Sequence, residues 1–198
     1  MVTRVIGVVG KIGSGKDEVL KYLKAKYGIP YLSTGDLVRD LAAKDGVKPT
    51  RENLEIISEQ CFIQMGKGCF VRMVADEIKK NGWKVAGISG IRAPADVHIL
   101  KEMFGNGFIL LRVDVADTKL RFQRILRRHE ARDPEKFEEF LVQERGEEEV
   151  FHVDKTAAMA NYALKNNGTI DDLHRQIDIL VKSKKLLPVT GPGFSAMR

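Results

Sequence analysis

The chain has 198 residues, of which 43% are hydrophobic and 30% charged, a composition typical of a globular protein with a sizeable core. It carries 33 Lys and Arg against 27 Asp and Glu, and the resulting net charge of +6 suits an anionic ligand without requiring nucleic acid. No apolar run approaches the ~18 residues of a membrane-spanning helix, no secretory signal follows Met1, and Cys61 and Cys69 lack metal or redox spacing. We therefore expect a cytoplasmic protein with neither a membrane nor a nucleic-acid partner.

Short apolar runs alternate with longer amphipathic stretches, a pattern that predicts β-α-β units and a parallel sheet. The first run, residues 4–9, is almost continuously apolar, as expected for a strand that helices cover on both faces. Residues 17–27 follow with apolar side chains spaced for one buried helical face. Further strands are expected at the end of residues 28–33 and over residues 84–89, 108–113 and 162–165. The sequence therefore predicts an α/β protein with five strands.

Two segments fit this pattern less well and are expected to lie over an edge of the sheet. Residues 35–82 hold three helical patterns between the second and third strands, far more than a short crossover needs. Residues 129–150 are dense in charge and have only a narrow apolar stripe. Residues 183–198 are basic and then rich in Gly and Pro, which predicts a tail that is flexible unless it docks. Residues 1–182 would then form a single domain.

The stretch VVGKIGSGKDEV, residues 8–19, has glycines and a lysine at the spacing of a phosphate-binding loop. The backbone N–H groups of such a loop cradle the phosphates of a nucleotide, and the helix that follows adds the positive end of its dipole. Lys16 would bridge the β- and γ-phosphate oxygens as a point charge. The alternative is a plain strand-to-helix turn. The expected nucleotide-binding residues are Gly10, Ile12, Gly13, Ser14, Gly15, Lys16 and Asp17.

Asp17 stands where such a loop normally has the Ser or Thr that holds Mg²⁺. Its carboxylate can bind Mg²⁺ directly or through water, although it also places negative charge beside the triphosphate. In the alternative interpretation, Asp17 is favoured by the helix dipole and the metal is held elsewhere. Asp17 is nevertheless the metal ligand that we expect from the sequence.

The segment YLSTGDLVRD, residues 31–40, resembles the nucleoside monophosphate kinases, in which a Ser-Thr-Gly-Asp-Leu segment opens the acceptor-binding helices. The acceptor-site residues that this resemblance implies are Thr34, Gly35, Asp36 and Arg39, with Arg39 on the acceptor phosphate. Taken alone, the same segment predicts only a helix N-cap. The Ser-Gly-Lys-Asp form of the loop is likewise similar to that of some phosphate-loop kinases of small phosphorylated metabolites.

The segment GISGIRAPADV, residues 87–97, is similar to the end of the third strand of these kinases. By this resemblance Arg92 takes the place of an arginine that clamps the acceptor phosphate. Two positions depart from the family pattern. Ser89 replaces an Asp that organises the water shell of Mg²⁺, and Asp96 replaces the Gln with which adenylate kinases read the adenine edge. The resemblance thus implies that Arg92 and Asp96 lie in the acceptor site, with metal arrangement and base preference open.

The segments QRILRRH, residues 123–129, and QERG, residues 143–146, look like the lid of dephospho-CoA kinases and adenylate kinases. The resemblance implies that Arg124, Arg128 and Arg145 act with Lys16 and Arg92 on the transferring phosphoryl group, whose charge arginine forks stabilise. Without the preceding loop, an ordinary charged helix would be the simpler interpretation.

The last segment, ANYALKNNGTIDDL at residues 160–173, resembles the ending of dephospho-CoA kinases. In that family the turn lays its backbone against the adenine of ATP, which implies this role for Asn166, Asn167 and Gly168. Thr169 would cap the final helix. Without the resemblance, the same letters predict only a turn.

The resemblance covers residues 4–182 and is closest to the adenylate-kinase-related, dephospho-CoA-kinase-like group of the P-loop nucleoside monophosphate kinase-like superfamily. It implies a three-layer P-loop NTPase fold with a five-stranded parallel sheet, a helical acceptor-binding insertion at residues 35–82 and a small lid at residues 129–150. It also implies ATP and Mg²⁺ as cofactors and transfer of the γ-phosphoryl group of ATP to a nucleoside monophosphate. Residues 50–72 also look like deoxynucleoside monophosphate kinases.

Two alternatives stay open at this point. A dephospho-CoA kinase-like enzyme would phosphorylate a sugar hydroxyl and would need a nearby carboxylate, for which Asp36 is the candidate. A nucleotide-binding sensor would keep the fold without fast turnover, and Asp17 and Ser89 favour that interpretation. The sequence predicts a small nucleotide substrate as the partner and leaves a monomer and a homodimer equally open.

Overall fold

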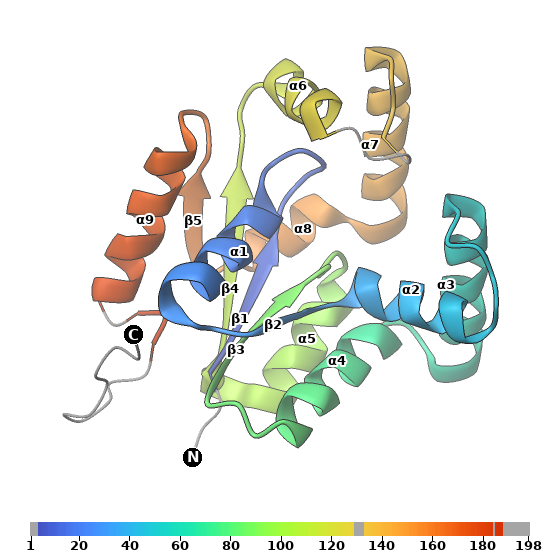
Figure 1. The fold of residues 1–198 in the computed structure, drawn as a ribbon, viewed down its shortest axis with the longest axis horizontal. Helices are drawn as coiled ribbons and strands as arrows, with labels where there is room; N and C mark the ends of the chain where they lie inside the picture. Colours follow the sequence, from blue (N-terminus) through green and yellow to red (C-terminus); the bar gives the residue numbers. More distant parts are fainter. Residues whose placement is uncertain (1–3, 129–132, 184, 188–198) are drawn as a thin grey trace.

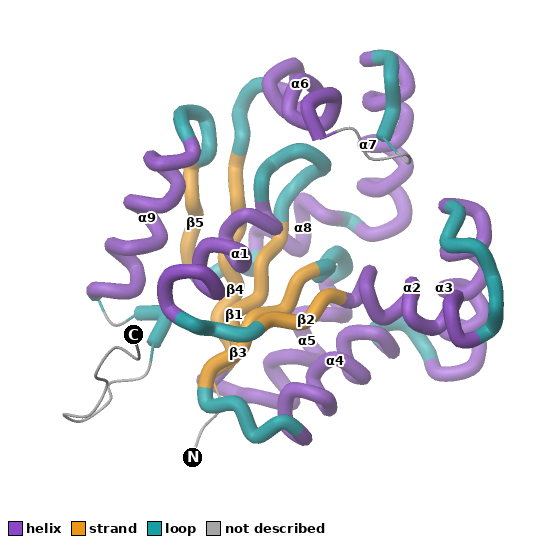
Figure 2. The backbone as a smooth tube through the Cα atoms, viewed as in Figure 1, coloured by secondary structure: helices purple, strands orange, loops and turns teal. Residues whose placement is uncertain are grey.

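The computed structural model describes residues 4–128, 133–183 and 185–187, which form a parallel sheet wrapped by helices (Figure 1). The sheet has five strands in the order β2-β3-β1-β4-β5, and every pair is parallel (Figure 2). The strands are β1 (Arg4–Val9), β2 (Tyr31–Ser33), β3 (Val85–Ser89), β4 (Phe108–Asp114) and β5 (Tyr162–Lys165). The predicted five-stranded α/β sheet is therefore confirmed, and the strands for which both ends were predicted have boundaries that differ by at most one residue.

Helices cover both faces of the sheet, and others stand at its carboxyl edge (Figure 1). Their bounds are α1 (Lys16–Tyr27), α2 (Thr34–Lys44), α3 (Arg51–Met65), α4 (Cys69–Lys80), α5 (Pro94–Phe104), η1 (Gly105–Gly107), α6 (Thr118–Arg128), α7 (Phe137–Phe151), α8 (Val153–Ala158) and α9 (Ile170–Lys182). Helices α1 and α9 lie on one face and α4, α5 and α8 on the other, while α6 and α7 rise beyond the strand ends. No helix in the described ranges is long and apolar enough to cross a membrane.

Alternate residues of the central strand face the two helical layers. Val5 and Val9 belong to the cluster that α4, α5 and α8 cover, whereas Ile6 and Val8 pack against α1 and α9. All four side chains are fully buried. Since burying such a side chain stabilises the fold by roughly 1.5–3 kcal/mol, this strand is a rigid base for the loop that follows it.

The three helical patterns expected within residues 35–82 are present as α2, α3 and α4. Helices α2 and α3 pack on each other to the side of the sheet. Helix α4 differs from the expectation of an edge position, because Val71, Val74 and Ile78 are buried in the main core. Its apolar residues recur at helical spacing and cover the sheet beside α5.

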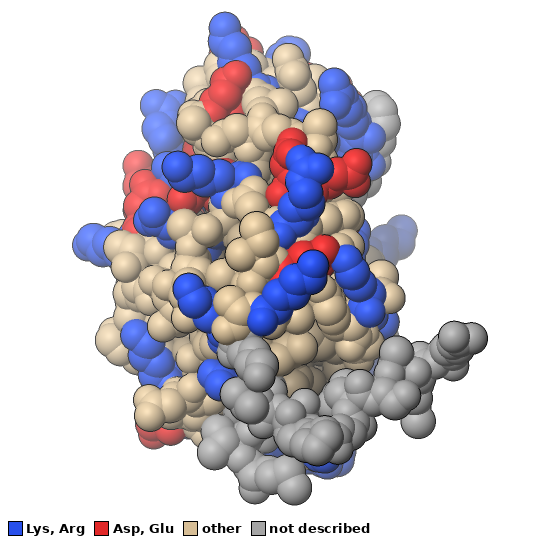
Figure 3. Space-filling model, turned by 90° about the vertical axis from the view of Figure 1, so that its left-hand side faces the viewer, with Lys and Arg blue, Asp and Glu red and all other residues tan. Residues whose placement is uncertain are grey.

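The segment that follows α9 begins packed against the core and not as the free tail that the sequence predicts. Leu186 is fully buried in the cluster that α1 and α9 form, and Lys185 donates from its backbone to Leu180. The rest of the expected tail, residues 188–198, lies outside the described residues. Figure 3 shows the side of the molecule on which α9 lies in Figure 1, where Lys and Arg side chains are spread over the surface with Asp and Glu side chains among them.

Candidate functional site

The loop between β1 and α1 has the conformation that a phosphate-binding loop needs. Gly13 and Gly15 have φ values of 75° and 85°, in the left-handed region that glycine adopts at low cost. Ser14 N–H donates to Lys11 O at 3.0 Å and closes the turn. Gly15 is the N-cap of α1 and supplies no side-chain cap, so the first N–H groups of the helix are available to an anion.

Gly13 and Gly15 are needed for a second reason, because neighbouring atoms leave no room for a side chain at either position. A Cβ atom on Gly15 would lie 2.5 Å from Asn166 Nδ2, and one on Gly13 would lie 2.5 Å from the carbonyl oxygen of Arg121. The loop is therefore packed between α6 and the turn that precedes α9. Substitution would displace one of these neighbours.

The charges of two arginines from other elements, Arg92 and Arg128, act on Lys16. Burial lowers the pKa of this amine; Asp17 and Glu147 oppose the shift, while Arg92 and Arg128 lower the pKa further. These arginines come from the loop after β3 and from α6. Arg92, Arg128 and the Glu147 carboxylate of α7 thus lie within electrostatic range of Lys16. Their joint action on a phosphoryl group stays a prediction.

Asp17 is joined to Ser89 at the end of β3. The Ser89 hydroxyl donates to Asp17 Oδ1 at 2.6 Å. Burial opposes ionisation of Asp17, but the charge of Lys16 and the Ser89 hydrogen bond outweigh it, so the pKa of the carboxyl lies below its ordinary value. The two residues that depart from the family pattern are therefore in direct contact.

The donor chemistry at this contact fits Mg²⁺. Proteins usually hold Mg²⁺ through one or two carboxylates, with substrate phosphates and water completing the octahedron, and Asp17 is such a carboxylate beside the loop. Within the described ranges no group of three or more His, Cys, Asp or Glu side chains is placed to hold a metal. An ion held by Asp17 would take its remaining ligands from phosphates and water.

The acceptor-side segment links the ends of β2 and β3. Thr34 Oγ1 donates to Gly90 O at 3.2 Å, and Gly90, with φ of 88°, has no room for a Cβ atom because it would overlap Thr34 Oγ1. Arg39 forms an ion pair with Asp36 one turn earlier. Ser33 accepts from Asp36 N–H at 3.3 Å, so the helix-cap interpretation of this segment is confirmed. The binding of an acceptor by these residues stays a prediction.

Arg92 and Asp96 have different environments. Arg92 Nε lies 3.6 Å from Glu147 Oε1, and its guanidinium is 5.3 Å from the ring of Phe151. Asp96 is buried, which raises the pKa of its carboxyl, and Oδ2 accepts from the N–H groups of Arg92 and Ala93 at 3.0 Å each. The Asp96 carboxylate therefore caps α5 and fixes the backbone of Arg92. Its role in base recognition stays a prediction.

Asn166 connects the loop with α6. Its Nδ2 donates to Ser14 O at 2.8 Å, and its Oδ1 accepts from Arg124 Nη2 at 3.4 Å. Arg124 also lies 3.5 Å from the carbonyl oxygen of Gly168. Asn167 Oδ1 accepts from the backbone of Ala116 at 2.9 Å. The turn expected to contact adenine thus lies directly beside the phosphate loop.

Three further residues named from the sequence lie on α6, on α7 and directly before α9. Thr169 caps α9 as predicted, accepting from Asp172 N–H at 3.2 Å. Arg128 Nε donates to Asp133 Oδ2 at 2.8 Å. Arg145 is exposed on α7, so its closure over the phosphates stays a prediction.

Sequence reasoning missed the acidic face that α7 turns toward the site. Glu144 lies 2.7 Å from Arg121 and 4.0 Å from Lys11, and Glu147 lies beside Arg92. Phe140, Glu144 and Glu147 recur at helical spacing, which places them on one face. That spacing was the available signal, but a charged helix is ordinarily assumed to turn such residues to solvent.

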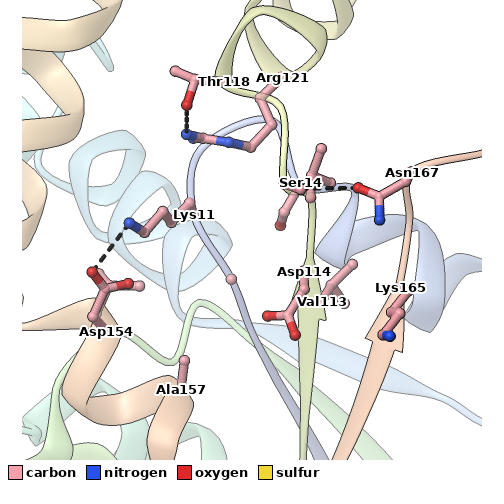
Figure 4. A pocket seen from close by; sticks show the side chains of 14 residues that line it. Lys11, Ser14, Val113, Asp114, Thr118, Arg121, Asp154, Ala157, Lys165 and Asn167 are labelled. Carbon is pink, nitrogen blue, oxygen red and sulfur yellow. Dashed lines mark hydrogen bonds and ion pairs between the residues drawn. The ribbon is translucent and has the colours of Figure 1, made fainter.

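A pocket of about 430 Å³ adjoins the loop on the side of α8 (Figure 4). Lys11 crosses its rim to pair with Asp154 at 3.1 Å. Ser14 lines it from above, and its buried hydroxyl has no hydrogen-bond partner within the described part of the chain. The carboxyl ends of β4 and β5 form the opposite wall, with Asp114 and Lys165. The loop therefore has open space next to it at the strand ends.

Similarity to known proteins identifies the family of this chain. The sequence matches the AAA domain family over residues 9–140. A UPF0200 protein of Pyrococcus horikoshii is 33% identical over 182 residues, which cover 89% of this chain and 95% of that protein. The chain belongs to the AAA domain family and to the UPF0200 family.

The fold of this UPF0200 chain is that of P-loop kinases. A shikimate kinase from Acinetobacter baumannii, solved with shikimate, has a TM-score of 0.55 at 21% identity and covers 93% of this chain and 96% of its own. A gluconokinase from Sinorhizobium meliloti has a TM-score of 0.56 at 12% identity, covering 93% and 97%. The predicted P-loop kinase-like fold is therefore confirmed.

Proposed function

We propose that this protein is an ATP-dependent phosphotransferase that moves the γ-phosphoryl group of ATP to a nucleotide-like acceptor, foremost a nucleoside monophosphate. The observation that carries the proposal is the loop between β1 and α1, where Gly13 and Gly15 have positive φ and the uncapped start of α1 leaves N–H groups to an anion. The charges of Arg92 and Arg128 act on Lys16 beside this loop. Phosphoryl transfer requires positioning and neutralisation of charge more than covalent chemistry. Cations from separate elements provide both, since closure of one element onto another completes the site.

In this proposal the loop N–H groups and Lys16 bind the donor phosphates, while Asn166 to Gly168 contact adenine. Arg39 and Arg92 bind the acceptor phosphate, and Arg124, Arg128 and Arg145 come over the phosphates when α6 and α7 close. Mg²⁺, when bound, neutralises charge on the β- and γ-phosphates, and Asp17 would hold it. Closure also excludes water, which would otherwise compete as acceptor.

The pairing of the arginines supports an acceptor that carries a phosphate. Arg39 and Arg92 each have a carboxylate partner, Asp36 and Glu147 respectively. A phosphate group has the charge and the oxygen geometry to replace these carboxylates, because arginine binds both groups with the same fork. The acceptor phosphate would thus replace the carboxylate in each of these two ion pairs.

A hydroxyl acceptor, as in dephospho-CoA, is the second candidate. The observation that favours it is Glu147, whose carboxylate influences both Lys16 and Arg92. A carboxylate near the transferred group can take the proton of an attacking hydroxyl. Glu147 is better placed for this than Asp36, which is largely exposed.

The test is acceptor-dependent release of ADP from ATP and Mg²⁺, across nucleoside monophosphates, deoxynucleotides and dephospho-CoA. We expect stimulation by a nucleotide acceptor, its loss in Lys16→Ala and its retention in Lys24→Ala, an exposed lysine on the same helix. Glu147→Gln separates the two candidates, because a hydroxyl acceptor would lose kcat and a phosphate acceptor would not. Tight ATP binding without acceptor-dependent turnover would refute the enzyme and favour a nucleotide sensor.

A further inference from the structure

Two departures from the usual phosphate-loop pattern meet in space. P-loop NTPases hold Mg²⁺ with a Ser or Thr hydroxyl that follows the loop lysine and with an Asp carboxylate on a neighbouring strand. Here the residue after Lys16 is Asp17, and the neighbouring strand β3 ends in Ser89. Considered separately, each substitution removes a metal-binding group.

The contact between them changes that interpretation. Ser89 Oγ and Asp17 Oδ1 are 2.6 Å apart, although 72 residues separate them in the chain. One carboxylate and one hydroxyl are therefore still present at the place where the usual pair would lie, with the same total charge. Only the element that carries each group differs.

We propose that this chain exchanges the two magnesium-binding groups, so that Asp17 on α1 supplies the carboxylate and Ser89 on β3 supplies the hydroxyl that orients it. The proposal rests on the nucleotide-binding function proposed above and specifies how its metal is held. Asp17 occupies the first turn of α1, where the helix dipole favours a negative group. Since that carboxylate adjoins the phosphates, nucleotide binding would depend strongly on the divalent ion.

The test measures binding rather than turnover. Titration calorimetry with the non-hydrolysable analogue β,γ-imido-ATP, once with Mg²⁺ and once with EDTA, gives the ratio of the two dissociation constants. For the wild type we expect Mg²⁺ to strengthen binding by about 10- to 100-fold, the range over which metal-site partners act. Asp17→Ser should bring the ratio close to one, and Ser89→Ala should reduce it.

The decisive variant is the double substitution Asp17→Ser with Ser89→Asp, which restores the usual arrangement. We expect its ratio to return to within about threefold of the wild type, with circular dichroism to verify that every variant is folded. The exchange would be overturned if Asp17→Ser alone kept the wild-type ratio of dissociation constants. It would also be overturned if the double variant had the same ratio as Asp17→Ser. Metal-independent binding by the wild type would overturn it while nucleotide binding stands. Complete absence of binding by the wild type would refute the proposed function as well.

Discussion

The junction of α6, α7 and the phosphate loop depends on Arg121, and its removal should be costly. The side chain is 4% exposed and lies 2.7 Å from Glu144, which is 16% exposed. It also donates to Ile12 O in the loop at 3.1 Å and stacks over Phe140 at 5.5 Å. Arg121→Ala would leave the largely buried Glu144 carboxylate with only Lys11, at 4.0 Å, as a cationic neighbour among the described residues, so we expect a loss of about 3 kcal/mol in the free energy of unfolding.

Denaturant unfolding of the wild type and Arg121→Ala measures this loss. The matched control is Arg175→Ala, since Arg175 is 71% exposed and pairs with Asp172 on one helix. Arg175→Ala should lower the free energy of unfolding by less than about 1 kcal/mol, as for other exposed ion pairs. A double-mutant cycle of Arg121→Ala with Glu144→Ala should give a coupling of about 1 to 3 kcal/mol. If Arg121→Ala costs no more than the control, the junction is not held by this pair and the reasoning fails.

Further substitutions test the acceptor side and the surface between α1 and α9. Gly90→Ala should lower the free energy of unfolding by about 2 kcal/mol or more, because Gly90 has a positive φ and a Cβ atom there would overlap Thr34 Oγ1. Gly28 has a φ of 66° but open space around it, so Gly28→Ala should lower the same free energy by about 1 kcal/mol. Chemical denaturation measures both losses. Glu147→Gln should lower the KM of a phosphate-bearing acceptor about two- to fivefold, because Arg92 loses a competing carboxylate; an increase would contradict this. Burial opposes ionisation of Asp178, but hydrogen bonds from Lys26, Tyr27 and Tyr22 lower the pKa of its carboxyl to about 2. The ionised carboxylate therefore adds stability above pH ~4, and this contribution should be lost as the pH falls through about 2. Acid unfolding of Asp178→Asn should lack that component.

Local patterns were sufficient to predict the sheet and the phosphate loop. A strand covered on both faces is an almost unbroken apolar run, and residues 4–9 are one. The loop is equally local, since glycine tolerates the positive φ that Gly13 and Gly15 have. Such features depend on neighbours in the sequence, which is why their boundaries agree with the structure to within a residue.

The acidic face of α7 could not be predicted in the same way. Glu144 and Glu147 are partly buried because their partners are cations from other elements, among them Lys11, over 130 residues away. A helical pattern of carboxylates ordinarily predicts a solvated surface. Only the folded arrangement shows that this surface lies against the loop.

Asp17 and Ser89 show the limit of judging positions one at a time. Each residue, compared with the usual pattern, suggests a weakened metal site and hence a protein that binds nucleotides without fast turnover. The structure places them 2.6 Å apart, so the two changes must be assessed as one substitution of a pair. A carboxylate and a hydroxyl exchanged between neighbouring elements leave the charge and the ligand chemistry of the pair unchanged. Under the proposed exchange, Asp17 and Ser89 no longer favour a non-catalytic sensor.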